Sequence, residues 1–323
     1  MEQEMAPLPA SRLQGCFPFE QTGLDFVGPL YVRQGRKKTK GYICLFTRTA
    51  TRAIHLEVTS DVSTKQFLHC LRRFFARRGH PITILSDNFR TFKAADRELH
   101  DLYKTLDCEK IRHETTSNRI HYLFITERAP WTGEHLVRSV KAPLRKVLRK
   151  TTLNFFEMRT VLCEVEPQVN SRPLTFVGDD PTSGDVLTPF HFLIGRGQST
   201  LPEVTAALPL IDGTNTSERH DLRRRSAYQQ RLLTHFWKRW RQEYIVTLST
   251  RRKWTKTRRE PQIGDIVLIA EDYVTKCKWP LRRVVQKYPG VNGLTRTVQV
   301  KTIRGMVTRP VARIHLLEAA RED

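Results

Sequence analysis

Two aspartates in this sequence lie in runs of apolar residues, where a charged side chain needs a physical reason. Asp25 is at the centre of TGLDFVGPL, and Asp87 follows the compact apolar run of Ile82, Ile84 and Leu85. An unpaired buried carboxylate is costly or takes up a proton, and a divalent cation removes that cost. Mg²⁺ prefers oxygen ligands from one or two carboxylates together with substrate phosphates. The pattern therefore indicates a metal site that acts on phosphodiesters.

A third acid comes from the stretch APWTGEHLVRSVKAPLRKVLRK, residues 129–150, which reads as a loop followed by a basic amphipathic helix with Glu134 in its first turn. An acid on a facing helix would complete a site in which two metal ions about 4 Å apart clamp the attacking and leaving oxygens of a phosphodiester. Spacing alone leaves alternatives open, because Asp87 and Asn88 can cap a turn and Glu134 can be an ordinary helix-favouring acid.

The elements that must position these acids form a mixed α/β layer. A strand is expected over residues 22–30, and GYICLFTRTATRAIHLEVTS predicts two strands joined near residues 49–52. A helix capped by Ser63 or Thr64 should end at Gly79, because apolar residues recur there at helical spacing. The remaining expected elements are a strand before Asp87, a polar helix at about 90–107, a strand near HYLFIT, and helices from the quoted stretch and at about 154–170.

Length and composition predict a soluble, intracellular protein of two domains. The chain has 323 residues, and single cores usually stop growing near this length. No apolar run approaches the roughly 18 residues that a membrane span needs, and the opening MEQEMAPLPASRL lacks the apolar centre of a signal peptide. The six cysteines are scattered without a CxxC pair, so neither a zinc site nor a disulfide framework is expected.

The net charge of +22 favours a polyanionic partner such as nucleic acid. Residues 218–259, a strongly basic helix by composition, carry 14 lysines and arginines against 3 acids, which is half of the net total. Its aromatic residues, Phe236, Trp237, Trp240 and Tyr244, are at helical spacing and are expected in a core. Before this helix, residues 197–217 form a linker; after it, short strands at roughly ten-residue spacing predict a small β-barrel.

Several motifs, in order, carry a resemblance to a known family. PFEQTGLDFVGPL, ITILSDNFRTF, ITERAPWTGEHLVRSVK, VEPQVNSRPLTF and LTPFHFLIGR resemble the integrase core of BEL/Pao-type LTR retrotransposons, which is related to retroviral integrases. FWKRWRQEYIVTLSTRRKW and GDIVLIAEDYVTKCKWPLRRVV resemble the C-terminal domain that follows it. The resemblance implies a ribonuclease-H-like mixed sheet with flanking helices, then the basic helix and a small SH3-like β-barrel. It also implies two Mg²⁺ or Mn²⁺ ions and the joining of element DNA ends to target DNA.

The resemblance assigns roles residue by residue. Asp25, Asp87 and Glu134 match the three catalytic and metal-binding acids, and Asn88 matches the asparagine after the second acid. Integrases of this type place basic residues against DNA on the helix that carries the third acid. The expected DNA-binding residues are Asn88, Arg138, Lys141, Arg145, Arg239, Arg251, Arg252 and Lys253.

The resemblance also implies a domain plan. Residues 1–18 resemble the tail that follows a His/His/Cys/Cys zinc module, which is missing, and 19–196 form the catalytic core. The linker spans 197–217, the basic helix 218–259, the barrel 260–318 and a tail 319–323. A homo-oligomer and, by function, a nuclear location are further expectations.

The sequence departs from the family pattern in the loop before Glu134. The family reads A-P-W-W-G-G-F-x-E, whereas this chain reads APWTGE and is short by about three residues, which can span up to ~10 Å. Glu127 is a substitute acid, but the family tolerates acids there without using them as ligands. Pro143 within the helix removes one backbone hydrogen bond and costs about 3 kcal/mol of helix stability unless a kink accommodates it.

Three hypotheses follow for the function of the protein: a metal-dependent strand-transfer enzyme, a non-enzymatic DNA-binding relic, and a ribonuclease-H-like nuclease.

Overall fold

In the computed structural model the chain forms two compact units. The first contains the described residues up to Glu166 together with Arg224–Leu233, and the second contains the described residues of 167–223 and 234–323. The residues that the structure describes are 17–87, 90–105, 120–124, 134–149, 151, 153–176, 186–197, 216–248, 260–271, 276–290, 293–302 and 305–320. No helix among them is long and apolar enough to cross a membrane.

A five-stranded mixed sheet is the centre of the first unit. Its strands are β1 (Gln21–Gln34), β2 (Lys37–Arg48), β3 (Ile54–Thr59), β4 (Thr83–Ser86) and β5 (His121–Phe124), in the spatial order β3-β2-β1-β4-β5. β1 pairs antiparallel with β2, and β2 with β3, whereas β1, β4 and β5 run parallel. This order and these directions confirm the ribonuclease-H-like sheet.

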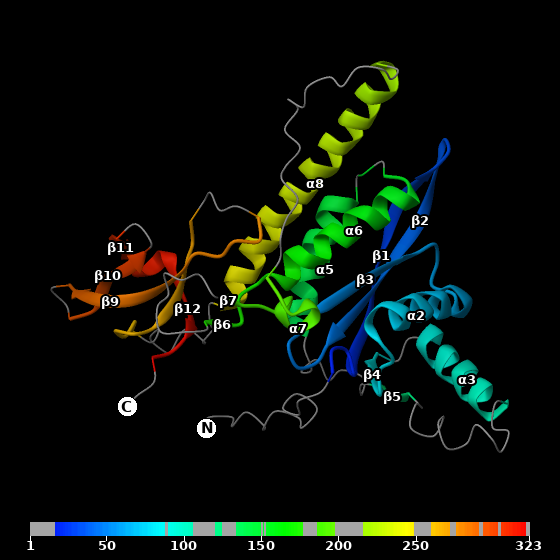
Figure 1. Ribbon diagram of the computed structural model, residues 1–323, viewed down its shortest axis with the longest axis horizontal. Coiled ribbons are helices and arrows are strands. Elements are labelled where there is room, and N and C mark those ends of the chain that lie inside the picture. Colours follow the sequence, from blue (N-terminus) through cyan, green and yellow to red (C-terminus); the bar gives the residue numbers. More distant parts are fainter. Residues whose placement is uncertain are drawn as a thin grey trace. The chain divides into compact units, whose positions relative to one another are not determined.

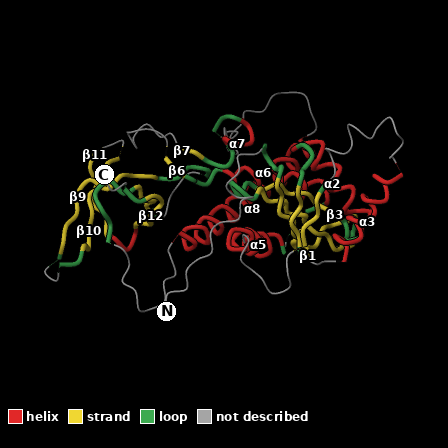
Figure 2. Tube along the Cα trace, turned by 90° about the horizontal axis from the view of Figure 1, so that it is seen from below, coloured by secondary structure: helices red, strands yellow, loops and turns green. Residues whose placement is uncertain are grey.

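Helices cover both faces of this sheet (Figures 1 and 2). α2 (Thr64–Arg78) and α3 (Arg90–Thr105) lie on one side, and α5 (Glu134–Leu148) and α6 (Phe155–Asn170) lie on the other. α2 begins as predicted, because the Ser63 side chain accepts a hydrogen bond from Gln66 N. It ends at Gly79, whose φ of 87° suits a residue without a Cβ.

Helix α5 runs from Glu134 to Leu148 with Pro143 inside it. Val140 and Leu144 are fully buried, as the amphipathic pattern predicted, and α5 packs against β1. Pro143 therefore lies within a helix that covers β1, the central strand of the sheet.

α6 begins with a reciprocal pair of hydrogen bonds: Asn154 Oδ1 accepts from Glu157 N at 2.9 Å, and Glu157 Oε2 accepts from Asn154 N at 2.8 Å.

The second unit contains a small antiparallel β domain, as the sequence predicted. Its five strands have the order β11-β10-β9-β8-β12, and the bounds are β8 (Ile266–Ile269), β9 (Leu281–Pro289), β10 (Thr295–Thr302), β11 (Gly305–Pro310) and β12 (Ile314–Glu318). Buried aliphatic side chains form its core: Val267, Ile269, Val284, Val298, Val300 and Ile314. The unit also contains β6 (Thr175–Phe176), β7 (Val186–Leu187) and α7 (His191–Ile194).

The long helix α8 (Thr216–Leu248) is the predicted basic helix, and its C-terminal half belongs to the second unit. Trp237, Trp240 and Tyr244 are buried on one face of α8 and pack around Trp279, with ring centroids 5.3 to 5.7 Å from the Trp279 ring. The prediction that these aromatic residues are core is confirmed.

Candidate metal and nucleic-acid site

The parallel pairing of β1 with β4 determines where the two aspartates lie. Its last pair joins Leu24 to Ser86, so Asp25 and Asp87 each come one residue later on neighbouring strands. Neighbouring strands are about 4.8 Å apart, and residues in equivalent register project from the same face. Asp87 is exposed directly after β4, whereas Asp25 is well inside β1, which is longer than the sequence predicted. The register therefore brings side by side the chain segments that carry the first two predicted acids.

The residue after Asp25 shows which face of the sheet the acid occupies. Phe26 stacks on Phe92 of α3, with centroids 4.9 Å apart, and meets Phe67 of α2 edge-on at 5.9 Å. Because successive side chains in a strand point to opposite faces, Asp25 projects toward the other face, which α5 covers. The aromatic packing of Phe26 thereby anchors β1 at the position of the acid.

Both carboxylate oxygens of Asp25 have a partner. Oδ1 accepts a hydrogen bond from Phe26 N at 2.7 Å, and Oδ2 forms an ion pair with the ammonium of Lys141 on α5. The Asp25 side chain is 35% exposed and that of Lys141 is 21% exposed, so the pair lies at the rim of the sheet. A lysine cation therefore neutralises this acid within the protein itself.

Glu134, the third predicted acid, is the first residue of α5, on the helix that packs against β1. Seven residues separate it from Lys141, so the two lie on nearly the same face of the helix and about 10 Å apart along its axis. The Glu134 side chain lies outside the described residues. Within the described part of the chain, no group of three or more His, Cys, Asp or Glu side chains is close enough to hold a metal ion. The donors that the structure does describe, two neighbouring carboxylates, match the ligand preference of Mg²⁺ or Mn²⁺.

The predicted DNA-binding residues have different surroundings. Arg138 and Arg145 of α5 and Arg239 of α8 are exposed, while Lys141 turns onto Asp25. The remaining four, Asn88, Arg251, Arg252 and Lys253, lie outside the described residues.

A basic residue of α8, Arg225, also has a carboxylate partner. Its guanidinium binds Glu157 of α6 through Nε at 2.8 Å and through a second nitrogen. Burial alone raises the pKa of Glu157, but the hydrogen bonds from Arg225 and from Asn154 N lower it more, so the net pKa lies below its ordinary value. Arg225 therefore attaches α8 to α6 of the first unit, and its charge is already compensated.

A buried ionic cluster on β3 was not predicted from the sequence. The His55 side chain is 2% exposed, and its Nδ1 and Nε2 atoms lie 3.0 Å from Glu166 and 3.3 Å from Glu57. Carboxylates accept hydrogen bonds, so this geometry suits an imidazole protonated on both nitrogens. Burial by itself lowers the pKa of His55, but the two carboxylates raise it more, and the net pKa lies above its ordinary value of 6.5.

Arginines of α2 complete this cluster. Arg73 Nε lies 2.6 Å from Glu57, Arg77 lies 3.2 Å from the same carboxylate, and Arg78 pairs with Glu166. Arg78 Nε is also 3.4 Å from His55 Nδ1, farther than the Glu166 carboxylate. Glu166 accepts a further hydrogen bond from Leu56 N of the edge strand β3 at 3.2 Å. The cluster therefore joins α2, α6 and the edge of the sheet. Two features of the sequence could have indicated it: the acid Glu166 among apolar residues of α6, and the sequence His-Leu-Glu in β3.

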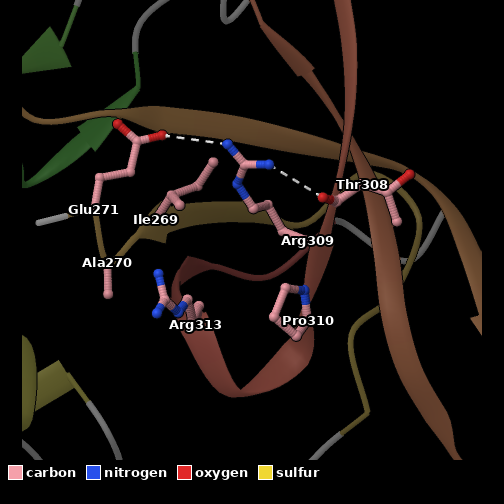
Figure 3. Close-up of a pocket in the computed structure, with 7 residues that line it drawn as sticks. All are labelled: Ile269, Ala270, Glu271, Thr308, Arg309, Pro310 and Arg313. Carbon is pink, nitrogen blue, oxygen red and sulfur yellow. Dashed lines mark hydrogen bonds and ion pairs between the residues drawn. The ribbon is translucent and has the colours of Figure 1, made fainter.

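An open pocket of about 510 Å³ in the second unit is a separate feature (Figure 3). Arg309 points toward Glu271, with 3.9 Å between the charged atoms, and Ile269 and Pro310 supply apolar wall. None of the predicted site residues lines this pocket. It is therefore not the predicted phosphodiester site.

Comparison with solved structures finds viral integrases. A simian T-cell lymphotropic virus intasome in complex with PP2A regulatory subunit B56 gamma matches with a TM-score of 0.34 and 11% identity, over 96% of this chain and 82% of that chain. The HTLV-2 integrase catalytic core domain in complex with magnesium matches with a TM-score of 0.31 and 12% identity, over 57% of this chain and 100% of that one. Because both scores are low, the fold is assigned from the order and directions of the strands.

Sequence comparison adds a match in the C-terminal half. No curated protein matches the chain. Residues 224–317, which include most of α8 and most of the antiparallel β domain, match the model of DUF5641, described as a family of unknown function.

Proposed function

We propose that this protein is an integrase-type nucleic-acid-binding protein of BEL/Pao retrotransposon origin that catalyses metal-dependent strand transfer of DNA. The observation that carries the proposal is the β1–β4 register, whose last pair, Leu24 with Ser86, comes one residue before Asp25 and Asp87. The motifs around these acids, and a net charge of +22, support a nucleic acid as the substrate. DNA ends and target DNA are the partners, and the nucleus is the place of action.

In this proposal the carboxylates of Asp25, Asp87 and Glu134 hold Mg²⁺ or Mn²⁺. The bound metal would supply Lewis-acid stabilisation of the oxygens that gain charge during in-line displacement at phosphorus. The chain's own residues bind and orient the DNA: exposed Arg138 and Arg145 lie on the helix that begins at Glu134. Their role is to bind DNA phosphates near Asp25 and Asp87, where they replace the counter-ions that accompany free DNA.

The test is a 3′-processing and strand-transfer assay with Mn²⁺ and duplex oligonucleotides. The Asp87→Asn variant, which keeps the size of the side chain and removes its charge, is assayed beside the wild type. We expect joined products from the wild type and at least about a hundredfold less from the variant, the loss expected when a group that acts only in the transition state is removed. Equal signals from the two proteins would overturn the proposal, and cleavage without joining would indicate a ribonuclease-H-like nuclease.

A second candidate function is non-enzymatic DNA binding, and the ion pair between Lys141 and Asp25 favours it. A lysine that neutralises Asp25 meets the electrostatic requirement of that acid without a metal. The shortened loop before Glu134 supports the same reading. In this case the wild type and Asp87→Asn would bind DNA equally well, and neither would join DNA ends.

A further inference from the structure

The surroundings of Asp25 bear on how a metal ion would reach it. Its Oδ1 is occupied by the amide hydrogen of Phe26 at 2.7 Å, and its Oδ2 by the ammonium of Lys141. A Mg²⁺ ion needs a carboxylate oxygen at about 2.0 to 2.1 Å, and an ammonium already on Oδ2 repels a dication at the same carboxylate. A metal ion at Asp25 and a lysine at Asp25 are therefore competing arrangements.

Among the basic residues described on the exposed side of α5, Lys141 is in a different position from its neighbours. Arg138, one turn earlier, and Arg145, one turn later, are exposed, whereas the Lys141 side chain is only 21% exposed. A lysine has a flexible four-carbon stem and a strongly hydrated ammonium, so it can leave a carboxylate at the rim and return to solvent. The competition can thus be resolved by a movement of one side chain.

We propose that Lys141 is a displaceable counter-ion: it holds Asp25 in the free protein, yields this carboxylate to a divalent metal, and then pairs with a nucleic-acid phosphate. This inference rests on the proposed function, since it assumes that Asp25 is a metal ligand. The metal and the phosphate then assist each other. A metal at Asp25 releases Lys141 to bind a phosphate, and a phosphate that binds Lys141 leaves Asp25 open to a metal. Thermodynamic reciprocity requires that DNA tighten metal binding by the same factor by which metal tightens DNA binding.

The first experiment measures Mn²⁺ binding to the full chain by electron paramagnetic resonance, without any assay of activity. In Lys141→Gln the competing cation is gone, so we expect Mn²⁺ to bind at least about tenfold more tightly than in the wild type. Lys141→Arg retains the charge and should stay near the wild type. Arg138→Gln removes the same charge from an exposed position one turn away, where solvent screening should limit the change to about twofold.

The second experiment uses the wild-type protein alone, so it does not depend on the folding of a variant. Lysine acetylation is mapped by mass spectrometry with and without Mn²⁺, at equal ionic strength. We expect the acetylation of Lys141 to rise when Mn²⁺ is added, because the ammonium is released from Asp25, while the acetylation of the exposed Lys146 stays constant.

The outcomes separate this inference from the proposed function. If the wild type binds Mn²⁺ and Asp87→Asn weakens that binding, but Lys141→Gln equals the wild type and the acetylation of Lys141 is unchanged, then only the displaceable counter-ion is wrong. If neither the wild type nor Lys141→Gln binds Mn²⁺, then the metal site itself is wrong and both ideas fail. Equal gains in Lys141→Gln and Arg138→Gln would also overturn the inference, because they would reflect general charge rather than a specific contact.

Discussion

His55 Nδ1 on β3 lies 3.0 Å from Glu166 Oε2 on α6, inside a cluster where the His55 side chain is 2% exposed. Glu57, on the same strand, approaches the other ring nitrogen at 3.3 Å, and Arg73, Arg77 and Arg78 of α2 pair with the two carboxylates. The imidazole of His55 between two acids thus connects an edge strand to helices on both faces of the sheet. This connection lies in the same compact unit as Asp25 and Asp87.

The stability of the first unit should depend on pH through His55. The folded pKa of His55 lies above its ordinary value of 6.5, so the protonated ring stabilises the fold fully below that value. This stabilisation is lost as the pH rises through the folded pKa. Thermal melts of the wild type and His55→Gln between pH 5.5 and 9, in steps of about half a unit, measure it.

The expected result for His55 is a difference between the two proteins that is largest at low pH and shrinks as the pH rises. His55→Gln also changes the packing against Phe74, whose ring is 5.5 Å away, but that loss does not vary with pH. A constant difference across the range would mean that His55 is neutral in the fold.

DNA binding through α8 should depend on the exposed arginine and not on the paired one. Arg239→Ala removes an exposed cation, and we expect the slope of log affinity against log salt to fall by about 0.9 for duplex DNA. Arg225→Ala is the matched control, because its guanidinium already binds Glu157, and the slope should not change. Fluorescence anisotropy with a duplex oligonucleotide at several salt concentrations measures both; equal changes would contradict the assignment.

The aromatic core of the second unit predicts a large loss of stability on truncation. Trp240 is fully buried and lies 5.7 Å from Trp279 and 5.5 Å from Tyr244, ring centroid to ring centroid. Trp240→Ala should lower the free energy of unfolding by about 3 to 5 kcal/mol through the lost burial and the cavity left behind. Urea denaturation followed by circular dichroism measures the change. Gln242→Ala, on the exposed side of the same helix, should change it by less than about 0.5 kcal/mol.

The cysteines should differ in reactivity in the folded protein. Burial raises the pKa of Cys70 to about 11 and raises that of Cys44 well above its ordinary value, so neither thiol ionises near neutral pH. Cys163 is exposed and should react first, although burial of its thiol also raises its pKa. Iodoacetamide labelling at about pH 8, followed by peptide mapping, tests this. Rapid labelling of Cys44 or Cys70 would show that the core opens locally.

Much of the fold was predictable because it follows from local patterns. The helix of α2, with its Ser63 cap and Gly79 end, and the aromatic stripe of α8 are both encoded by residues close together in the chain. Antiparallel strands separated by Gly and Pro turns also have a short-range signature. The mixed sheet and the small antiparallel β domain are therefore predictable from the sequence.

The candidate site, like the fold, was predictable from the sequence only in part. The sequence shows which acids lie in apolar surroundings, because the cost of a buried charge is a property of the residues and their neighbours. It does not show the register of parallel strands that are about 60 residues apart, since no local turn sets it. That register pairs Leu24 with Ser86, one residue before Asp25 and Asp87, and only the folded chain shows it.

The sequence by itself determined the elements, the excess of positive charge and the identity of the acids. The tertiary structure alone decided which cations meet those acids. Arg138, Lys141 and Arg145 look equivalent in the sequence, yet only Lys141 turns onto Asp25, and of the basic residues of α8 it is Arg225 that binds Glu157. The members of each ion pair are separated by many residues along the chain. They meet only when packing brings their elements within a few ångströms, because the attraction between two charges in a protein is strong only at such short distances.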